Sequence, residues 1–424
     1  MNVLLIGSGG RESAMAWKLS QSKLLKKLYI APGNPGVEAH GEVVNIGVEE
    51  FEKLSAFALE KKIDMLIVGP EVPLVKGIKD FFKSNLATKH IAVIGPDSKG
   101  AVLEGSKDFS KSFMQKYGIP TAKYATFTKE TLNEGLHYLA TNQGPYVLKA
   151  DGLAAGKGVI ITNNLAEAQA TLKEMIANLK FGEASAKVVI EEFLSGIEVS
   201  VFVLSDGLNY LILPEAKDYK RIGEGDTGPN TGGMGAVSPV PFADAAFMKK
   251  VEERIIVPTV KGLRAEGIDY KGFIFFGLIN VKNEPMVIEY NCRMGDPETE
   301  VVMPRIKSDL LELLTKVETE QLNTVKIEFE THAATTVMCV AGGYPDEYAK
   351  GKVISKLNEL KDVMVFHAGT KRNEKGEIVT NGGRVIALTA TGKDRNEALA
   401  KSKLASQTIA WEGKYFRSDI GFDL

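Results

Sequence analysis

The chain has 424 residues, of which 44% are hydrophobic and 25% charged, and its formal net charge is −2. This composition is typical of a globular protein of about three domains, at ~150 residues a domain. A charge so close to neutral and spread along the chain gives no electrostatic case for a nucleic acid or a membrane surface as partner.

The first residues, MNVLLIGSGG, contain neither a basic leader nor a cleavage region, and no apolar run reaches the ~20 residues of a membrane span. The two cysteines, Cys292 and Cys339, lie far apart in the sequence. We therefore expect no disulfide framework and a cytoplasmic protein.

The first hundred residues alternate short apolar runs with helical patterns, which predicts a parallel α/β sheet. Several runs end in Gly/Pro turns, and ligands bind at the carboxyl ends of such strands, so these turns are candidates for one site. The apolar runs are Val3–Ile6, Leu28–Ile30, Val43–Ile46, Met65–Val68 and Ile91–Ile94, and the helical patterns are Arg11–Ser20 and Glu49–Lys61.

The first turn matches a dinucleotide-binding fingerprint only in part. Gly7 and Gly9 fit G-x-G-x-x-G, but Glu12 stands in place of the third glycine, and the second strand lacks the acidic residue that would hold a ribose. The pattern therefore disfavours NAD or FAD. Two interpretations stay open, namely a phosphate site at the N-terminus of the helix that begins near Arg11 and a tight turn without a ligand.

The stretch KADGLAAGKGVII, Lys149–Ile161, is glycine-rich but is not a P-loop, because Gly158 stands where that motif requires Ser or Thr. It reads as a β-hairpin with the tip Asp151–Lys157. Small residues in the tip would let backbone N–H groups approach a polyphosphate, while Lys149 and Lys157 supply positive charge. The alternative is a flexible tip with two solvated lysines.

Three glutamates interrupt the apolar runs that follow, Glu191 and Glu192 in VVIEEFL and Glu198 in EVSVFVL. A strand carboxylate among apolar neighbours needs a partner, because burying it unpaired is costly. An adenine amino group, a ribose hydroxyl or a lysine side chain could each be the partner of such a carboxylate.

A long segment rich in glycine and charge, Ala216–Pro239, comes next. Loops of this length without regular structure are usually functional or disordered. Asp218, Lys220 and Arg221 precede a stretch of Gly, Thr and Asn, Thr227–Gly235. We interpret the segment as a loop that covers a substrate.

The stretch MVIEYNCRMGDPETE contains Glu289 and Asn291 in one predicted strand. Because they are two residues apart, they project from the same face, and their oxygen atoms suit a hard cation such as Mg²⁺. Arg293 can pair bidentately with a carboxylate or a phosphate. The chain then turns at Asp296 toward a helix expected near Lys307–Val317. The alternative to a metal site at Glu289 and Asn291 is a strand end at which these residues cap a turn.

Read in order, these motifs resemble the glycinamide ribonucleotide synthetases, or phosphoribosylamine–glycine ligases, a family within the ATP-grasp superfamily. The hairpin and the final E-x-N are shared across that superfamily, whereas DTGPNTGGMG and NCRMGDPET are more specific to the family. The matching stretches are GSGGRE, APGNPG, VGPEVPLVKG, LEGSK, VLKADGLAAGKGV, VIEEFLSGIEVS, DTGPNTGGMGA, VIEYNCRMGDPET, AGGYP, FHAGT and TNGGRV.

The resemblance implies a multidomain protein of α/β and α+β type. It implies an N-terminal parallel α/β domain over residues 1–104, an ATP-grasp domain over 105–325 with a mobile lid at 122–194, and a small C-terminal α+β domain over 326–424. It also implies that ATP phosphorylates glycine and that 5-phosphoribosylamine attacks the glycyl phosphate, in purine biosynthesis. The implied cofactor is Mg²⁺ or Mn²⁺, the implied partners are small molecules only, and we expect a monomer.

The resemblance further assigns residues to roles. The metal would be held by Glu289 and Asn291, and Arg293 and Asp296 would orient glycine and the acyl phosphate. ATP would be bound by Lys107, Lys149, Asp151, Gly152, Gly156, Lys157, Gly158, Glu191, Phe193, Glu198 and Asn230. The substrate pocket would be lined by Gly9, Gly10, Arg11, Asn34, Pro35, Glu71, Asp218, Lys220, Arg221 and Gly295, with His367 and Arg384 as candidates for the substrate phosphate.

Two other functions compete with the ligase. One is another ATP-grasp enzyme, of the biotin carboxylase or carboxyaminoimidazole ribonucleotide type, and the other is a nucleotide-binding module without catalysis. DTGPNTGGMG and NCRMGDPET disfavour the first, and Lys149, Glu289 and Asn291 argue against the second. The strand Gly272–Val281 carries no carboxylate, so the ligands of a second metal stay open.

Overall fold

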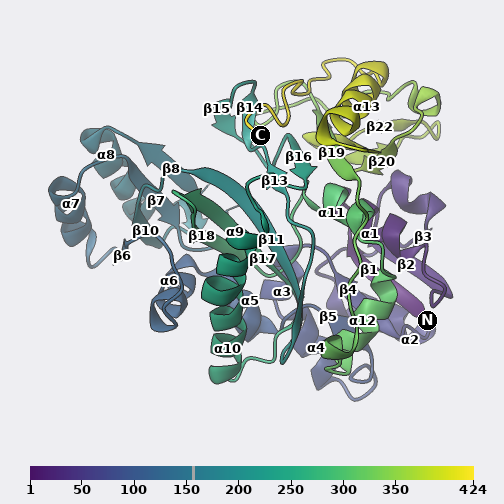
Figure 1. The fold of residues 1–424 in the computed structure, drawn as a ribbon, viewed down its shortest axis with the longest axis horizontal. Coiled ribbons are helices and arrows are strands. Elements are labelled where there is room, and N and C mark those ends of the chain that lie inside the picture. The colour runs from purple at the N-terminus through teal and green to yellow at the C-terminus, as the bar shows by residue number, and fades with distance from the viewer. Residues whose placement is uncertain (155–157) are drawn as a thin grey trace.

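The computed structural model describes residues 1–154 and 158–424. Figure 1 shows an N-terminal unit in purple, a group of helices and strands that projects to the far side from it, and a C-terminal unit in yellow. A pair of long antiparallel strands, β11 and β17, lies between these parts.

The N-terminal unit is a five-stranded parallel sheet of order β3-β2-β1-β4-β5, as predicted. Val3 to Ile6 are fully buried, which agrees with the apolar composition of a sheet covered on both faces. The elements are β1 Asn2–Gly7, α1 Gly10–Leu19, β2 Lys27–Pro32, the 3₁₀ helix Pro35–Ala39, β3 Glu42–Val43, α2 Phe51–Glu60, β4 Met65–Val68, α3 Glu71–Val75, α4 Ile78–Ser84 and β5 Ala92–Ile94.

The projecting unit, which we call the lid, is a four-stranded antiparallel sheet of order β6-β10-β7-β8 with two helices. Its buried side chains form a hydrophobic cluster of their own. The strands are β6 Tyr124–Thr128, β7 Tyr146–Ala150, β8 Val159–Thr162 and β10 Lys187–Glu192, the helices are α7 Leu132–Thr141 and α8 Leu165–Ala177, and β9 is Lys180–Glu183. The predicted hairpin is therefore present in β7 and β8.

A second antiparallel sheet, of order β12-β11-β17-β18, faces the lid. The strands are β11 Ile197–Asp206, β12 Tyr210–Ile212, β17 Lys271–Val281 and β18 Glu284–Asn291. The helices of this region are α5 Ser98–Gly105, α6 Lys107–Lys116, α9 Ala245–Val251 and α10 Val257–Ala265, with a π-helical turn at Glu252–Ile256 between the last two.

The expectation of an irregular loop at Ala216–Pro239 is wrong. The segment contains four short strands, and one of them is fully buried and pairs with a strand of the C-terminal unit. Glycine and charge concealed these strands, because both are depleted in ordinary strands. The strands are β13 Lys217–Asp218, β14 Arg221–Gly223, β15 Thr227–Asn230 and β16 Gly235–Ser238.

The C-terminal unit shares a sheet with that segment, in the order β13-β16-β19-β23-β20. Its elements are β19 Ala333–Val340, β20 Met364–His367, β21 Thr370–Arg372, β22 Ile378–Thr380, β23 Arg384–Gly392 and α13 Arg395–Thr408, with 3₁₀ turns at Leu322–Thr324 and Leu357–Glu359. The domain boundary expected at residue 325 stays a prediction.

Two helices follow the E-x-N strand where one was predicted, α11 Thr299–Arg305 and α12 Leu310–Glu318. The second begins later than expected because Asp309 caps it by accepting a hydrogen bond from the Glu312 backbone. In the described part of the chain, none of the helices combines the length and apolar character needed to cross a membrane.

Candidate active site

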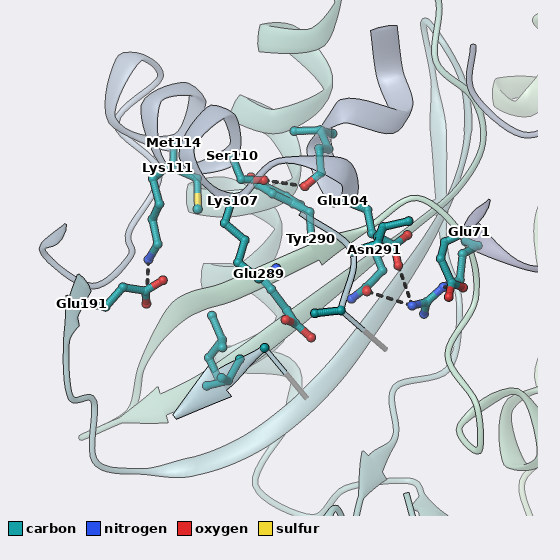
Figure 2. Close-up of a pocket in the computed structure, with 17 residues that line it drawn as sticks. Glu71, Glu104, Lys107, Ser110, Lys111, Met114, Glu191, Glu289, Tyr290 and Asn291 are labelled. Atoms are coloured by element: carbon teal, nitrogen blue, oxygen red, sulfur yellow. Dashed lines mark hydrogen bonds and ion pairs between the residues drawn. The ribbon is translucent and has the colours of Figure 1, made fainter. Parts of the chain in front are cut away.

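A cavity of about 180 Å³ lies between the lid and the second antiparallel sheet. It is closed by residues of α5, α6, the β7–β8 hairpin, β10 and β18, and Figure 2 shows their side chains converging on it. The glycine-rich hairpin and the E-x-N strand therefore line the same cavity, although they are about 130 positions apart in the sequence. The predicted residues on its wall are Glu71, Lys107, Gly158, Glu191, Glu289, Asn291 and Arg293.

One end of the cavity holds a buried carboxylate between two ammonium groups. Glu191 of β10 lies 3.0 Å from Lys149 of β7 and 3.0 Å from Lys111 of α6, and all three side chains are almost fully buried. Burial lowers the pKa of Lys111 to about 8, against the opposing effect of Glu191. Sequence reasoning missed Lys111, although it lies one turn after Lys107 on the same face of α6.

The beginning of α6 is tied to the end of β7. The Asp151 carboxylate accepts hydrogen bonds from the Ser106 hydroxyl at 3.0 Å and from the Asp108 backbone at 2.8 Å. Lys107 Nζ donates to the carbonyl oxygen of Gly152 at 3.2 Å. The Asp151 side chain therefore joins the hairpin to the helix N-terminus that carries Lys107, where it also complements the helix dipole.

The opposite wall presents the predicted metal pair from the end of β18. Burial alone would raise the pKa of Glu289, but Lys220, Lys149 and Lys107 hold it below its ordinary value, so the carboxylate stays ionised. Asn291 is buried, and its amide nitrogen has no hydrogen-bond partner among the described residues. Figure 2 shows both side chains at the cavity.

The donor chemistry of this pair fits Mg²⁺ or Mn²⁺. A carboxylate and an amide are the oxygen ligands that Mg²⁺ takes, and such sites are usually completed by substrate phosphates and water. Among residues 1–154 and 158–424, no group of three or more His, Cys, Asp or Glu side chains could hold a metal on its own. The pair would therefore bind a metal together with a nucleotide rather than as a preformed cage.

Arg293 joins the metal strand to two carboxylates from earlier in the chain. Its guanidinium lies 2.6 Å from Glu104 of α5 and 3.3 Å from Glu71 of α3, and it donates to Asn291 Oδ1 at 3.0 Å. Although burial opposes charge, these carboxylates raise the pKa of Arg293. Glu104, which also accepts from the Cys292 backbone at 2.8 Å, was missed, although it lies in the LEGSK stretch.

A second group of charges lies where the N-terminal turn meets the segment after β18. The Arg11 backbone donates to Asp296 Oδ2 at 3.3 Å, and Arg384 of β23 lies 3.0 Å from Asp296 Oδ1. A side chain in place of Gly10 would collide with Glu300, and one in place of Gly9 would contact Asp296. Glycine is thus required at this turn for the close approach of two segments.

The residues at the start of the 216–239 segment stand between these two groups. Lys220 Nζ lies 2.6 Å from Glu198 Oε2, which joins the segment to β11. Burial raises the pKa of Asp218, against the attraction of Lys220. Glu298, whose carboxylate accepts from Ser200 at 2.9 Å, has its pKa raised to about 7 by burial and by Asp218.

Asn34 and His367, both candidates for substrate binding, contact each other's segments of the chain. The Asn34 amide donates to the carbonyl oxygens of Ser8 and His367 at 2.9 Å each, and its oxygen caps the 3₁₀ helix that begins at Pro35. The His367 ring contacts Thr370 at 3.0 Å, and burial lowers the pKa of His367 to about 4.

The remaining predicted residues are at the margins of the cavity or in the fold around it. Phe193 is 44% exposed after β10, and Arg221 and Asn230 face each other in the β14–β15 hairpin. A side chain at Gly295 would collide with Glu298. Glu12, which stands where the fingerprint has its third glycine, pairs with Arg11 at 2.6 Å and accepts from the Gly9 backbone at 2.6 Å. Gly156 and Lys157 lie outside the described residues.

The lid, the second antiparallel sheet and the cavity between them, with the lysines on one wall and the acid–amide pair on the other, define an ATP-grasp protein. Three domain descriptions of phosphoribosylglycinamide synthetase match the chain, the N domain at residues 1–104, the ATP-grasp (A) domain at 105–299 and the C domain at 334–423. The chain belongs to the phosphoribosylglycinamide synthetase family.

Individual relatives agree with this assignment. The chain is 48% identical over its whole length to a phosphoribosylamine–glycine ligase of Vibrio vulnificus and 46% identical to one of Escherichia coli K12, covering 98% of each. It covers all of a solved phosphoribosylamine–glycine ligase of Thermotoga maritima, with 99% of its own length aligned, 35% identity and a TM-score of 0.83. A biotin carboxylase of Campylobacter jejuni, at 18% identity and a TM-score of 0.72, shares the fold.

Proposed function

We propose that this chain is an ATP-dependent ligase that joins glycine to 5-phosphoribosylamine and releases glycinamide ribonucleotide, ADP and phosphate. The observation that carries the proposal is the cavity lined by Lys107, Glu289 and Asn291, with Lys149 paired to Glu191 at its wall, within a chain that matches the family from end to end. The activity places the chain in purine biosynthesis.

ATP occupies the cavity with its phosphates toward Lys107 and the glycine-rich hairpin, and with adenine toward Glu191. The small residues of the hairpin support this, because a side chain at Gly158 would collide with Ala154 and one at Gly152 with Ala184. Small residues in the rest of the glycine-rich stretch would let phosphate approach the backbone closely.

Glu289 and Asn291 would hold Mg²⁺ or Mn²⁺. When bound, the ion neutralises charge on the transferring phosphoryl group. Lys107 on the cavity wall, and Lys149 beside it in its ion pair with Glu191, supply further positive charge. Gly156 and Lys157, in the expected tip of the hairpin, belong to the same proposal.

Chemistry at the substrate consists of two displacements. A carboxylate oxygen of glycine attacks the γ-phosphorus and ADP leaves, which gives glycyl phosphate. The amine of 5-phosphoribosylamine then attacks the glycyl carbonyl, the C–N bond forms, phosphate leaves with that oxygen, and the amine releases a proton. Arg293 and Asp296 orient glycine, and the protein supplies positioning and charge rather than a nucleophile.

The phosphoribosyl group lies toward the N-terminal turn, Gly9 to Arg11, with Asp218, Lys220 and Arg384 nearby. This is supported by the meeting of segments from the N-terminal unit, the 216–239 segment and β23 around Asp296 and Glu298. We further propose a cytoplasmic monomer with small-molecule partners and no nucleic acid, and a division into residues 1–104, 105–325 and 326–424 with the lid at 122–194.

The test is phosphate release from ATP by the purified full-length chain, measured with each substrate omitted in turn. We expect release only when glycine and phosphoribosylamine are both present. Release with bicarbonate in place of glycine would instead indicate a carboxylase-like ATP-grasp enzyme. Binding of ATP without release in any mixture would indicate a nucleotide-binding module.

A further inference from the structure

The last ten residues of the chain, YFRSDIGFDL, lie against the β14–β15 hairpin. Figure 1 shows the C-terminus directly beside β14. We call these residues, 415–424, the C-terminal tail. It is anchored on one side to β19 by a pair of backbone hydrogen bonds between Tyr415 and Val340, of 2.8 and 3.1 Å. On its other side it contacts the hairpin.

Arg417 is the centre of the contact between the tail and the hairpin. Its side chain is 0% exposed and lies 2.6 Å from Asp226 in the hairpin turn and 2.8 Å from Asp419 in the tail. Its guanidinium also donates to the Arg221 carbonyl at 3.1 Å and lies 5.4 Å from the ring centre of Tyr219. A buried guanidinium with two carboxylate partners is costly to remove, because its partners are then left unpaired.

Further contacts fasten the same hairpin at its turn. The Tyr415 hydroxyl donates to the Ile222 carbonyl at 3.0 Å, the Ser418 hydroxyl donates to Glu224 at 2.5 Å, and the Gly225 backbone donates to Asp419 at 2.7 Å. The hairpin itself is a two-stranded sheet whose second strand is exposed along its length. Hairpins of two strands are marginally stable alone, so these contacts decide its position.

Lys220 connects this arrangement to the active site. It stands in the chain between Tyr219, whose hydroxyl donates to Asp423 at 2.7 Å, and Arg221, whose carbonyl is held by Arg417. Its ammonium lies 2.6 Å from Glu198 Oε2 of β11, the strand beside β17 in the second antiparallel sheet. A displacement of the hairpin would move Lys220 directly.

We infer that the C-terminal tail, through Arg417, is a positioning element of the substrate site that sets the place of Lys220 and of the β14–β15 hairpin. Arg417 touches neither the ATP cavity nor the metal pair, so its effect falls on the acceptor substrates rather than on nucleotide binding. The inference rests on the proposed function, and turnover by the unaltered enzyme in the same assay tests that function separately.

The experiment compares Arg417→Met and Arg417→Lys with the unaltered enzyme. We expect Arg417→Met to raise the KM for phosphoribosylamine at least about tenfold, the equivalent of one charge-assisted hydrogen bond, and to leave the Kd for ATP within about twofold. Hydrogen exchange of residues 221–230 should become faster in the same variant. Arg417→Lys should be partly rescued, because it keeps the charge but loses the fork of donors.

Lys352→Met is the matched control, because its ion pair with Glu412 lies in the C-terminal unit without contact to the hairpin. If Arg417→Met fails to fold, the double variant Tyr415→Phe/Ser418→Ala removes two exposed contacts and should raise the same KM about threefold. An unchanged KM in the folded variant would overturn the inference. The inference would also be overturned if the affinities for ATP and for phosphoribosylamine fell together while the hydrogen exchange of residues 221–230 stayed unaltered.

Discussion

Glu289, near the end of β18, is a carboxylate that faces several cations. Lys107, Lys149 and Lys220 act on it from three different elements and lower its pKa, while its own neighbour Asn291 supplies only an uncharged oxygen. An anionic ligand is thus available at this point of the cavity, whereas Lys149 is paired with Glu191 and Lys220 with Glu198.

Replacing Glu289 by glutamine should therefore lower kcat at least about a hundredfold while the fold stays intact, because the amide keeps the shape but not the charge. Steady-state turnover at saturating Mg²⁺ and far-UV circular dichroism measure the two effects. Glu284→Gln, on the same strand but paired with Lys250 and Arg254 at the surface, is the control. Activity of the first variant within a few-fold of the control would remove Glu289 from the metal role.

Glu298 gives the molecule a dependence of stability on pH. Burial and the nearby Asp218 raise its pKa from 4.5 to about 7, so the folded state binds this proton more tightly than the unfolded chain does. The contribution to stability is complete below pH 4.5 and is lost as the pH rises through 7.

We accordingly expect the urea midpoint of the unaltered protein to fall between about pH 5 and about pH 8, and to fall less in Glu298→Gln, which carries no charge at any pH. Chemical unfolding at four or five pH values measures the difference. Parallel curves for the two proteins would show that the carboxyl group is not protonated in the folded state.

Single residues differ in how far sequence alone could place them. Glu289 and Asn291 were predictable because they share one strand and one face. Lys111 and Glu104 were not, because their roles depend on partners 80 or more positions away, Glu191 and Arg293. The contact of Asp151 with the Ser106 hydroxyl and the Asp108 backbone is likewise a tertiary feature that the composition of the glycine-rich stretch does not reveal.

At the scale of elements, the strands of the first hundred residues and the hairpin were predictable. In both, the apolar pattern of the sequence agrees with the strands that the fold contains. The 216–239 segment was not. Its β16 is built from Gly-Ala-Val-Ser and owes its structure to pairing with β19. Short strands of this kind form only when the partner sheet is present. The β-propensity of their residues therefore does not predict them.

The β8 strand is where nucleotide binding should be most visible. It is an edge strand that pairs with β7, and Val159 lines the cavity. We expect ATP with Mg²⁺ to slow amide hydrogen exchange in Val159–Thr162, because contact with the phosphates restricts opening of the edge. The opposite edge strand, β6, is the internal control, and equal protection of β8 with and without ATP would contradict its role as part of the lid.

At the scale of the whole molecule, the lid has a hydrophobic core separate from that of the other units. The largest hydrophobic cluster runs from β1 through β11 and α11 to β19 and β23, and so joins the N-terminal sheet, the second antiparallel sheet and the C-terminal unit. The lid has a separate cluster. Glu289, Asp296 and Lys220 lie outside the lid, whereas Lys149 and Glu191 belong to it. That the lid moves as a unit stays a prediction.

The proposed function requires the transfer of a phosphoryl group from ATP to the carboxylate of glycine. The most direct measurement uses glycine labelled with ¹⁸O in its carboxylate, together with ATP and phosphoribosylamine, and mass analysis of the phosphate released. We predict one labelled oxygen in each phosphate, because that oxygen forms the bond to phosphorus and leaves with it. Unlabelled phosphate would contradict the account.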